Sequence, residues 1–193
     1  MGQLSFFSAE ARQPDVGDLA GLLCGPGQAV SFARGTAARV SVVLDEPWRA
    51  GALMSACAER GVLAQLGASE EGHALVRTAF RTDLTTLAAQ WLRGAVKSVP
   101  AGFEPHGAEL RLWALTSGRW SEGSYLLGLD PDAPDTHEPL REALACCCLP
   151  ATVLAPRGGE PALRVTGRRR LARLAELVGR PPRGVVQQMW PAA

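Results

Sequence analysis

Two segments of the chain share a short apolar run that is followed by apolar residues at helical spacing. The short apolar run is residues 73–78 in the first segment and residues 161–166 in the second. The helically spaced residues that follow end before Gly94 in the first segment and before Gly179 in the second. A spacing of three to four residues predicts a helix buried on one face, and glycine commonly follows the last turn of a helix. The second segment follows the first after 88 residues for the strands (73 to 161) and 87 for the helices (87 to 174). The helical positions are Leu84, Leu87, Ala88 and Trp91 in the first segment and Leu171, Leu174, Ala175 and Val178 in the second.

The similarity extends towards the N-terminus of both segments, with shifts of a few residues between elements. Loops of different length produce such shifts. Each half therefore predicts the order helix, strand, strand, helix, strand, strand, helix. The paired segments are 40–45 with 125–130, 48–60 with 137–148, and 63–66 with 151–154, and the opening helices are 16–24 and 108–116.

The predicted strands of each pair are too close in sequence for a crossover helix, so they indicate antiparallel hairpins. The fold class that follows is α+β, with two tandem αββαββα repeats. Pro and Gly cluster between the two halves, which is typical of a connecting segment. We expect an N-terminal tail at 1–15, the first repeat at 16–94, the connecting segment at 95–107, the second repeat at 108–180 and a C-terminal tail at 181–193.

The charge of the chain is nearly balanced, with 20 Lys and Arg against 19 Asp and Glu in 193 residues. Lys97 is the only lysine, and the remaining basic residues are arginines. Arginine is spread along the chain beside abundant Ala, Gly and Pro, as a high-GC bacterial genome would encode it. A net charge of +1 excludes nucleic-acid binding through overall charge, but not through a local basic face.

Residue types that carry catalysis or bind metals form no recognisable pattern. Cys24, Cys57 and the run 146–148 lack the spacing of a disulfide framework or a zinc site, so we interpret them as small apolar residues within helices. Unpaired thiols predict a reducing compartment such as the cytoplasm. The aspartates of 130–135 are expected in turn and helix-capping roles. No apolar stretch is long enough to span a membrane, and no cofactor is expected.

The first opening helix carries a recognisable signature. Residues 19–27 read Leu-Ala-Gly-Leu-Leu-Cys-Gly-Pro-Gly, which resembles the signature of the LAGLIDADG family. The resemblance implies that the two opening helices pack together at a pseudo-dyad and that two saddle-shaped antiparallel sheets straddle DNA. Ala20 and Gly21 are small enough for such helix contact. The second copy would be 110–118, where Leu112 and Trp113 are larger than the residues that pack in that family.

Departures from the signature determine the expected activity. In the nuclease members the eighth signature position is an acid that holds a divalent metal, and here Pro26 and Ser117 stand at the two such positions. Hard cations need carboxylates to anchor them, so we expect no bound metal, no DNA cleavage and no enzymatic activity. Repeats of this kind without the acids are similar to the N-terminal part of the WhiA-type sporulation regulators of high-GC Gram-positive bacteria. Those regulators carry a helix-turn-helix after the repeats, for which the segment 180–193 is too short.

The N-terminal residues Gln3, Leu4, Ser5, Phe6 and Phe7 resemble the QLxLF peptides by which bacterial replication and repair proteins dock on the sliding clamp. In such a peptide the amide anchors at the rim of a pocket, while the leucine and the aromatic rings fill an apolar groove. Phe6 stands where leucine is usual. The alternative is that Phe6 and Phe7 pack on the domain, as an edge strand or as a docked tail.

Arginines at two places are candidates for contact with DNA phosphates and base edges. Four lie in or near predicted strands, where they would project from the saddle surface. Four others lie at the start of the last helix, opposite its apolar stripe, where a merely solvated face is the alternative. The candidates are Arg34, Arg39, Arg77 and Arg164 in the strands and Arg168, Arg169, Arg170 and Arg173 in the helix.

Two functions follow as alternatives. The first is a non-catalytic DNA-associated accessory or regulatory protein that docks on the replication sliding clamp through residues 3–7. The second is a protein–protein interaction module that uses the same saddle without touching DNA. A third, a divergent nuclease, would need relocated acids, for which Glu104, Glu109 and Glu122 flank the second copy.

Overall fold

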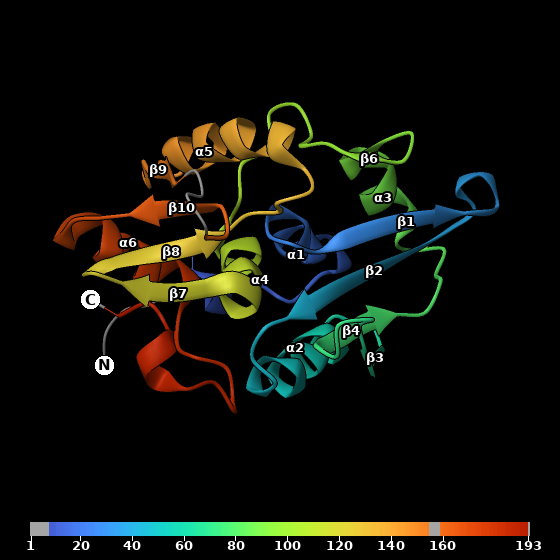
Figure 1. Cartoon of the computed structure of the whole chain (residues 1–193), viewed down its shortest axis with the longest axis horizontal. Coiled ribbons are helices and arrows are strands. Elements are labelled where there is room, and N and C mark those ends of the chain that lie inside the picture. Colours follow the sequence, from blue (N-terminus) through green and yellow to red (C-terminus); the bar gives the residue numbers. More distant parts are fainter. Residues whose placement is uncertain (1–7, 155–158, 193) are drawn as a thin grey trace.

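A computed structural model describes residues 8–154 and 159–192 of the chain. Over these residues, two four-stranded sheets lie side by side with six α-helices and one short two-stranded hairpin (Figure 1). The first half contains α1 (Ala20–Cys24), β1 (Gln28–Phe32), β2 (Ala37–Leu44), α2 (Trp48–Glu59), β3 (Ala64–Ala68), β4 (Ala74–Thr78) and α3 (Thr85–Trp91), and the hairpin follows as β5 (Leu92–Arg93) and β6 (Val96–Lys97). The second half contains α4 (Gly107–Ser117), β7 (Gly118–Ser121), β8 (Ser124–Gly128), α5 (His137–Cys146), β9 (Thr152–Leu154), β10 (Ala162–Val165) and α6 (Arg168–Val178).

Both sheets have the same strand order. It is β1-β2-β4-β3 in the first sheet and β7-β8-β10-β9 in the second, and every neighbouring pair is antiparallel. Each half also keeps the order helix, strand, strand, helix, strand, strand, helix. The predicted α+β class with two tandem αββαββα repeats is confirmed.

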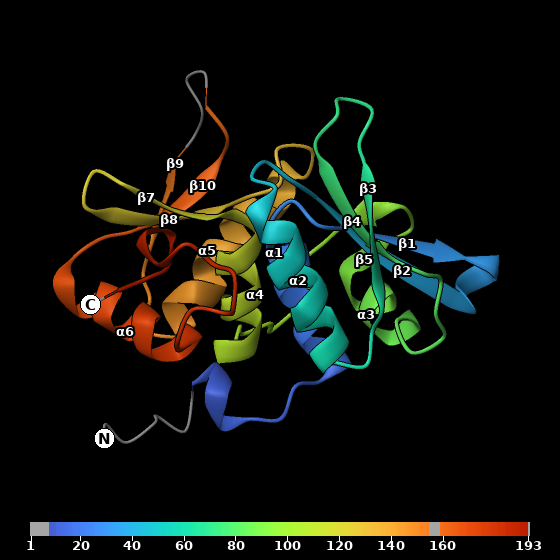
Figure 2. The ribbon, with the colours of Figure 1, turned by 90° about the horizontal axis from the view of Figure 1, so that it is seen from below.

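The helices cover one face of each sheet. In Figure 2 the sheets lie above the helices, and the uncovered faces of both sheets point to the same side of the molecule. Burial alternates along β2, where Ala38, Val40, Val42 and Leu44 are buried against the helices and Arg39 faces the other way. A strand with one packed face requires this period of two. The uncovered face of each sheet is called its outer face below.

Strand pairing corrects the register predicted for the last strand of each repeat. Val42 of β2 pairs with Val76, and Leu127 of β8 pairs with Leu163. These pairs place β8 85 residues after β2, as predicted, but β10 only 87 residues after β4 rather than 88. An offset of 88 would equate the buried Val76 with the exposed Arg164. The error arose because both runs contain Ala-Leu and align on it, whereas only the neighbouring strand fixes which residues face the core.

The central helices α1 and α4 meet closely because Gly21 of α1 leaves room for the backbone of α4, and Gly25, directly after α1, leaves room for Trp113. A Cβ atom on Gly21 would lie 2.2 Å from the carbonyl oxygen of Glu109, and one on Gly25 would lie 3.2 Å from the ring of Trp113. Trp113 is fully buried, and its indole N–H donates to the carbonyl of Gly128 at 2.7 Å. The bulky residue of the second signature copy is therefore accommodated by the small residue that it faces.

The cysteine run lies at the end of α5 and not within it. α5 ends at Cys146, and Cys148 has a left-handed φ of 62°, the conformation that commonly ends a helix. Cys146 and Cys148 are exposed, so the interpretation of the run as small apolar residues inside a helix is wrong, whereas Cys24 and Cys57 are buried as expected. No helix in the described ranges is both long and apolar enough to cross a membrane.

Both ends of the described chain pack against the second repeat. Trp190 is buried, its indole N–H donates to the carbonyl of Gly179 at 2.8 Å, and its own carbonyl accepts from the indole of Trp120 at 3.1 Å. At the other end Ser8 is buried, and the carboxylate of Glu10 accepts the backbone N–H of Arg180 at 3.1 Å. Residues outside the two repeats therefore contribute to the core around α6.

A single buried ammonium group joins the first repeat, the connecting segment and the second repeat. Lys97 Nζ donates to the carbonyl oxygens of Gly25 at 2.6 Å and Gly27 at 2.7 Å, just after α1, and to Asp130 Oδ2 at 2.9 Å, just after β8. Burial lowers the pKa of Lys97 below its ordinary value, and the Asp130 carboxylate opposes this shift. The ammonium thus has an oxygen partner for each of its three N–H donors. A planar guanidinium does not match three oxygens arranged around one point, which explains why this position holds the one lysine of an arginine-rich chain.

Asp130 has two roles, one on each carboxylate oxygen. Oδ1 accepts the backbone N–H of Asp132 at 3.0 Å, which is the turn role that the sequence predicts. Oδ2 accepts from Lys97 and also from the side-chain amide of Gln28, at 2.5 Å. The carboxylate therefore belongs to the contact between the repeats as well as to a turn.

Arg49 of α2 closes the C-terminal end of α4 in a similar way. Its guanidinium is buried and donates to the carbonyl oxygens of Leu115 and Gly118, each at 2.7 Å. Burial lowers the pKa of Arg49, and Glu46 opposes this shift. Free carbonyl groups make the C-terminal end of a helix attractive to cations. Each of the two central helices therefore ends against a positive charge that the chain itself supplies.

Replacing Lys97 tests whether this ammonium holds the repeats together. Lys97→Met keeps the aliphatic stem but leaves the buried Asp130 carboxylate without its cation, so we expect the free energy of unfolding to fall by about 3–5 kcal/mol in urea titrations. Lys97→Arg should also destabilise, although it preserves the charge, because the planar group does not fit the three oxygens. Arg93→Ala, which removes an exposed charge from the same hairpin, serves as the control and should change little. Wild-type stability of Lys97→Arg would contradict this account.

Candidate nucleic-acid interface

The outer faces of the two sheets carry arginine as their only charged strand residue. Of the residues that the structure places in the eight strands of these sheets, four are charged, and all four are arginines on the outer faces: Arg39, Arg77, Arg119 and Arg164. No Asp or Glu occurs in these strands. The chain is nearly neutral as a whole, but the strand positions of its outer faces carry a charge of +4.

The acids on this side of the molecule lie in loops. Glu70 and Glu71 belong to the loop between β3 and β4, and Glu122 to the turn between β7 and β8. Glu160 precedes β10, and its carboxylate lies 3.8 Å from the guanidinium of Arg119. Glu160 therefore partly offsets the charge of Arg119, whereas the structure shows no ion pair of a loop acid with Arg39, Arg77 or Arg164 among the described residues.

Arg77 and Arg164 occupy equivalent places in the two repeats. Arg77 lies in a cross-strand row with Gln28, Ser41 and Gln65 on the first sheet. Arg164 lies in the corresponding row on the second sheet, with Arg119, Leu126 and Thr152. Both arginines are exposed on the third strand of their sheet. The two sheets therefore present a matched pair of guanidinium groups on one side of the molecule.

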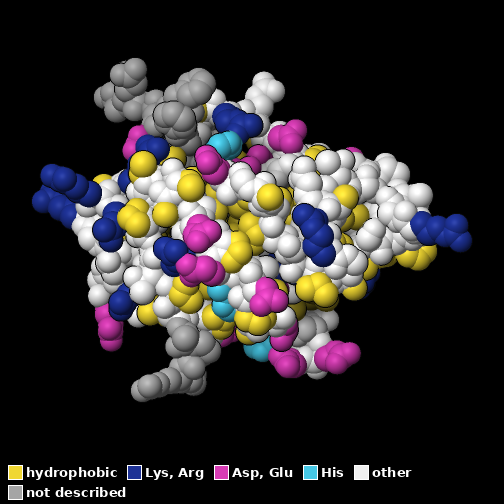
Figure 3. Space-filling model, turned by 90° about the horizontal axis from the view of Figure 1, so that it is seen from above, with side chains coloured by type: hydrophobic (Ala, Val, Ile, Leu, Met, Phe, Trp, Pro, Cys, Tyr) yellow, Lys and Arg dark blue, Asp and Glu magenta, His cyan; other side chains and the backbone are white. Residues whose placement is uncertain are grey.

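Arg34 and Arg39 lie towards the outer end of the first sheet. Arg34 is exposed at the tip of the β1–β2 hairpin, with a left-handed φ of 58°. Arg39 lies in β2 with its guanidinium carbon 4.8 Å from the ring centre of Phe80. Figure 3 shows basic side chains at both ends of the long axis, over the β1–β2 hairpin at one end and the start of α6 at the other.

The helix arginines do not share a face with the strand arginines. Arg168, Arg169 and Arg170 are exposed at the start of α6, which lies with the other helices on the covered side of the second sheet (Figure 2). Arg173 is half-buried, and its guanidinium lies 3.0 Å from the carboxylate of Glu176. One ligand on the outer faces would therefore not reach this helix cluster without passing round the edge of the sheet.

The ends of the central helices do not fit a divalent metal ion. Pro26 has no ligand atom, and Ser117 turns its hydroxyl towards the carbonyls of Trp113 and Gly128, at 3.3 Å each. The carboxylate of Asp130, which Lys97 connects to the carbonyl groups after α1, is already bound to that ammonium. A hard cation would have to displace that ammonium and would meet one carboxylate in place of several. Among the described residues, no group of three or more His, Cys, Asp or Glu is placed to hold a metal ion.

The acids considered for a divergent nuclease are separated. Glu109 lies in the first turn of α4, where its carboxylate accepts the backbone N–H of His106 at 3.0 Å, so it faces away from the C-terminal end that carries Ser117. Glu104 lines a pocket beside the cysteine run, and Glu122 lies in the β7–β8 turn. These three carboxylates have no common site.

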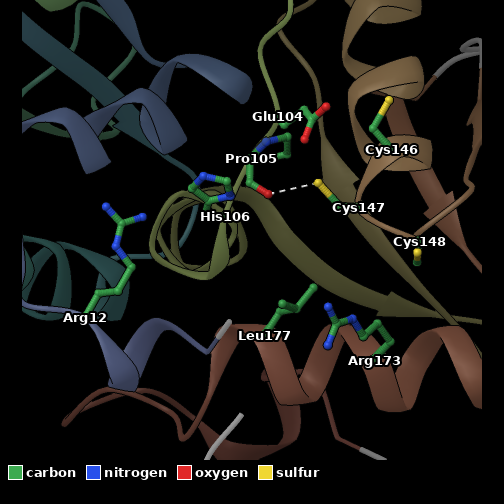
Figure 4. Close-up of a pocket in the computed structure, with 9 residues that line it drawn as sticks. All are labelled: Arg12, Glu104, Pro105, His106, Cys146, Cys147, Cys148, Arg173 and Leu177. Atoms are coloured by element: carbon green, nitrogen blue, oxygen red, sulfur yellow. Dashed lines mark hydrogen bonds between the residues drawn. The ribbon is translucent and has the colours of Figure 1, made fainter. Parts of the chain in front are cut away.

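A separate pocket of about 430 Å³ lies among the helices, where α5 and α6 approach the start of α4 (Figure 4). The thiol of Cys147 lies in it and donates to the carbonyl oxygen of Pro105 at 3.0 Å. Burial raises the pKa of this thiol to about 11, so it stays protonated at neutral pH and is a poor nucleophile. Figure 4 also shows that the three thiols of the run do not point towards a common centre. The pocket therefore offers no catalytic or metal-binding arrangement of the cysteines.

The remaining sequence-predicted site, Gln3 to Phe7, lies outside the described residues. Sequence reasoning also missed several functional candidates that the fold brings out, namely Arg119, Lys97 with Asp130, and the exposed rings of Phe32 and Phe80. For Lys97 a signal existed, because one lysine among so many arginines suggests a position that needs an ammonium. For the others, the sequence does not show which side of a strand is left uncovered.

Comparison of the sequence with protein-family models and with curated proteins gives no match. Comparison of the structure does give matches. The homing endonuclease I-WcaI, solved bound to its DNA recognition sequence, superposes with a TM-score of 0.60 at 12% identity, over 92% of this chain and 83% of that one. The N-terminal LAGLIDADG domain of DUF199/WhiA superposes with a TM-score of 0.55 at 12% identity, over 84% and 81%. Full-length DUF199/WhiA from Thermatoga maritima gives 0.58 at 12% identity, over 93% of this chain but 57% of that longer one.

These superpositions extend over most of the chain and therefore include both repeats. At 12% identity they concern the fold and not the activity of the proteins compared. The resemblance first recognised in residues 19–27 is confirmed at the level of three-dimensional structure. The chain has a two-repeat LAGLIDADG-like fold.

Proposed function

We propose that this protein is a DNA-binding accessory or regulatory protein that does not cut DNA. The observation that carries the proposal is the charge of the outer faces, whose strands contain four arginines and no acid in a chain of net charge +1. Phosphate contacts supply most of the affinity of DNA-binding proteins, and arginine suits them through its planar set of donors. Arg77 and Arg164 occupy equivalent positions in the two repeats, so each would contact the DNA backbone in one half of a duplex site.

The similarity to I-WcaI supports this proposal because that protein was solved bound to DNA. The outer faces here lie on the side that the resemblance to the LAGLIDADG family assigns to DNA.

Absence of cleavage is proposed from the chemistry of the helix ends. Pro26 and Ser117 replace the two acids of the nuclease signature, and Lys97 and Arg49 neutralise the carbonyl groups at the same two helix ends. A divalent metal would therefore meet positive charge where it needs carboxylates. A protein built in this way binds DNA without an electrophile to activate the phosphate.

A protein-interaction module is the second candidate, and the apolar part of the first sheet favours it. Val30 and Phe32 are exposed on the outer face of this sheet, and the exposed ring of Phe80 lies 5.1 Å from that of Phe32. Exposed apolar side chains that lie close together are common at protein interfaces. The two candidates differ in their dependence on salt, because only DNA binding releases counterions.

Docking on the sliding clamp is a further part of the proposal and rests on residues 3–7 alone. The described chain begins directly after this pentapeptide, at Ser8, which is buried beside the second repeat. A clamp-binding peptide at this position would tether the arginine faces to replicating DNA and raise their local concentration there.

Replacing the paired arginines tests DNA binding. In fluorescence anisotropy with a 30-base-pair duplex, Arg77→Ala with Arg164→Ala should weaken binding and lower the slope of log affinity against log salt by about 1 for each arginine lost. The matched control, Arg93→Ala with Arg141→Ala, removes two charges away from the outer faces and should keep the wild-type slope. A wild-type slope near zero would reject DNA binding and favour the protein-interaction module.

Supercoiled plasmid tests the absence of cleavage. We expect no nicking by the wild-type protein with Mg²⁺ or Mn²⁺ under conditions in which it binds the plasmid, because no carboxylate pair is available to hold the ion. Nicking that requires the metal and disappears in Glu109→Gln would instead establish a divergent nuclease.

Clamp docking is tested by replacing Gln3, Leu4 and Phe7 together with alanine. Biolayer interferometry against a purified bacterial sliding clamp should show binding that this triple variant loses, because both the anchoring amide and the apolar side chains are gone. Gln13→Ala, outside the pentapeptide, is the control and should bind normally. Equal affinity of the triple variant and the wild type would reject clamp docking through these residues.

A further inference from the structure

Two exposed aromatic rings stand together at the outer end of the first sheet. Phe32, the last residue of β1, is 60% exposed, and Phe80, just after β4, is 41% exposed. Their ring centres are 5.1 Å apart, with the planes inclined by 42°. Leaving large apolar side chains in water forgoes the stabilisation that burial would give, so an exposed ring pair on a sheet face suggests a binding role.

An irregularity in strand pairing places Phe80 on this face. Ser41 pairs with Arg77, but Ala38 pairs with Arg81, so the segment after β4 contains one more residue than the β2 residues that it faces. At the same point, the backbone N–H of Val40 donates to the hydroxyl of Thr78 at 3.1 Å. An extra residue of this kind is a β-bulge, which redirects the neighbouring side chain. The bulge brings Phe80 beside Phe32 and Arg39.

Arg39 adds a cation to the ring pair. Its guanidinium carbon lies 4.8 Å from the ring centre of Phe80, within the range of a cation–π contact. Its Nε is buried and has no hydrogen-bond partner among the described residues. Val30, which pairs with Arg39 across β1 and β2, forms the apolar side of the group. Val30, Phe32, Arg39 and Phe80 together are called the aromatic cluster.

We propose that the aromatic cluster binds an unstacked DNA base, so that the protein prefers DNA containing unpaired nucleotides to a fully paired duplex. This inference rests on the proposed DNA-binding function. In a regular duplex both faces of every base are covered by neighbouring bases, so a ring on a sheet surface finds no base face to contact. An unpaired base exposes its face, and stacking on an aromatic ring does not depend on which base it is.

The surroundings of the cluster suit the backbone on either side of such a base. Arg34 is exposed at the tip of the same hairpin, and Arg77 is exposed further along the outer face. The strands of this sheet offer no acid that would repel phosphate. The cluster therefore combines what single-stranded nucleic acid sites use, which is aromatic surface for the base and cations for the backbone.

The test compares two oligonucleotides that differ only in pairing. One is a 30-base-pair duplex, and the other is the same duplex with a two-nucleotide bulge in one strand that contains 2-aminopurine. Fluorescence anisotropy should show tighter binding to the bulged duplex by about tenfold, or about 1.4 kcal/mol, and 2-aminopurine fluorescence should fall as that base stacks. Phe32→Ala, which keeps the contact of Arg39 with Phe80, should reduce this preference, and Phe80→Ala should reduce it as well.

Leu66→Ala is the matched control, because Leu66 is a 57% exposed apolar residue of the same sheet that lies opposite the buried Val76 and not on the outer face. It should keep the wild-type preference. Equal affinity for the bulged and paired duplexes would overturn the inference and leave DNA binding intact, whereas failure to bind either oligonucleotide would reject the proposed function itself. A self-association in analytical ultracentrifugation that Phe32→Ala abolishes, without any preference for the bulge, would assign the cluster to a protein contact and also overturn the inference.

Discussion

The contact of α1 with α4 is the constraint on which the rest of this structure depends. Gly21 allows the backbone of α4 to approach α1 to a distance that no side chain would permit. This approach brings the C-terminal ends of two helices to one region, where their free carbonyl groups accumulate negative potential. The chain neutralises that potential with its own cations, Lys97 at one helix and Arg49 at the other. The same contact fixes how the two sheets stand relative to each other, because each sheet continues directly from one of the helices.

Much of this fold follows from sequence because its elements are local and repeat. The spacing of Leu84, Leu87 and Trp91 predicts α3 from the residues of one helix face, and the second repeat provides an independent copy of the same pattern. The α+β class and the matching order of elements are therefore accessible without coordinates. The number of residues that separates β4 from its equivalent β10 is not accessible in this way. It depends on how each of these strands pairs with a neighbouring strand more than 30 residues away.

The candidate site was less accessible to sequence reasoning, for the same physical reason. Arg39, Arg77 and Arg164 were proposed from their strands, but Arg119 was missed because β7 is short and follows α4 without a break. Phe80 reaches the outer face through a bulge, which leaves no mark in the apolar pattern. The partners of Lys97 lie 33 to 72 residues away, so neither its burial nor its role can be read from its neighbours.

The burial of Lys97 has a consequence for how the protein can be regulated in a cell. Acetylation, ubiquitin-like tagging and other modifications of lysine need an accessible side-chain amine, and the only lysine of this chain is held by three oxygens in the interior. Enzymes that write such marks find no side-chain substrate on the folded protein. Amine-reactive probes and cross-linkers will likewise pass over its lysine until the two repeats separate, so the appearance of a labelled lysine would report that separation directly.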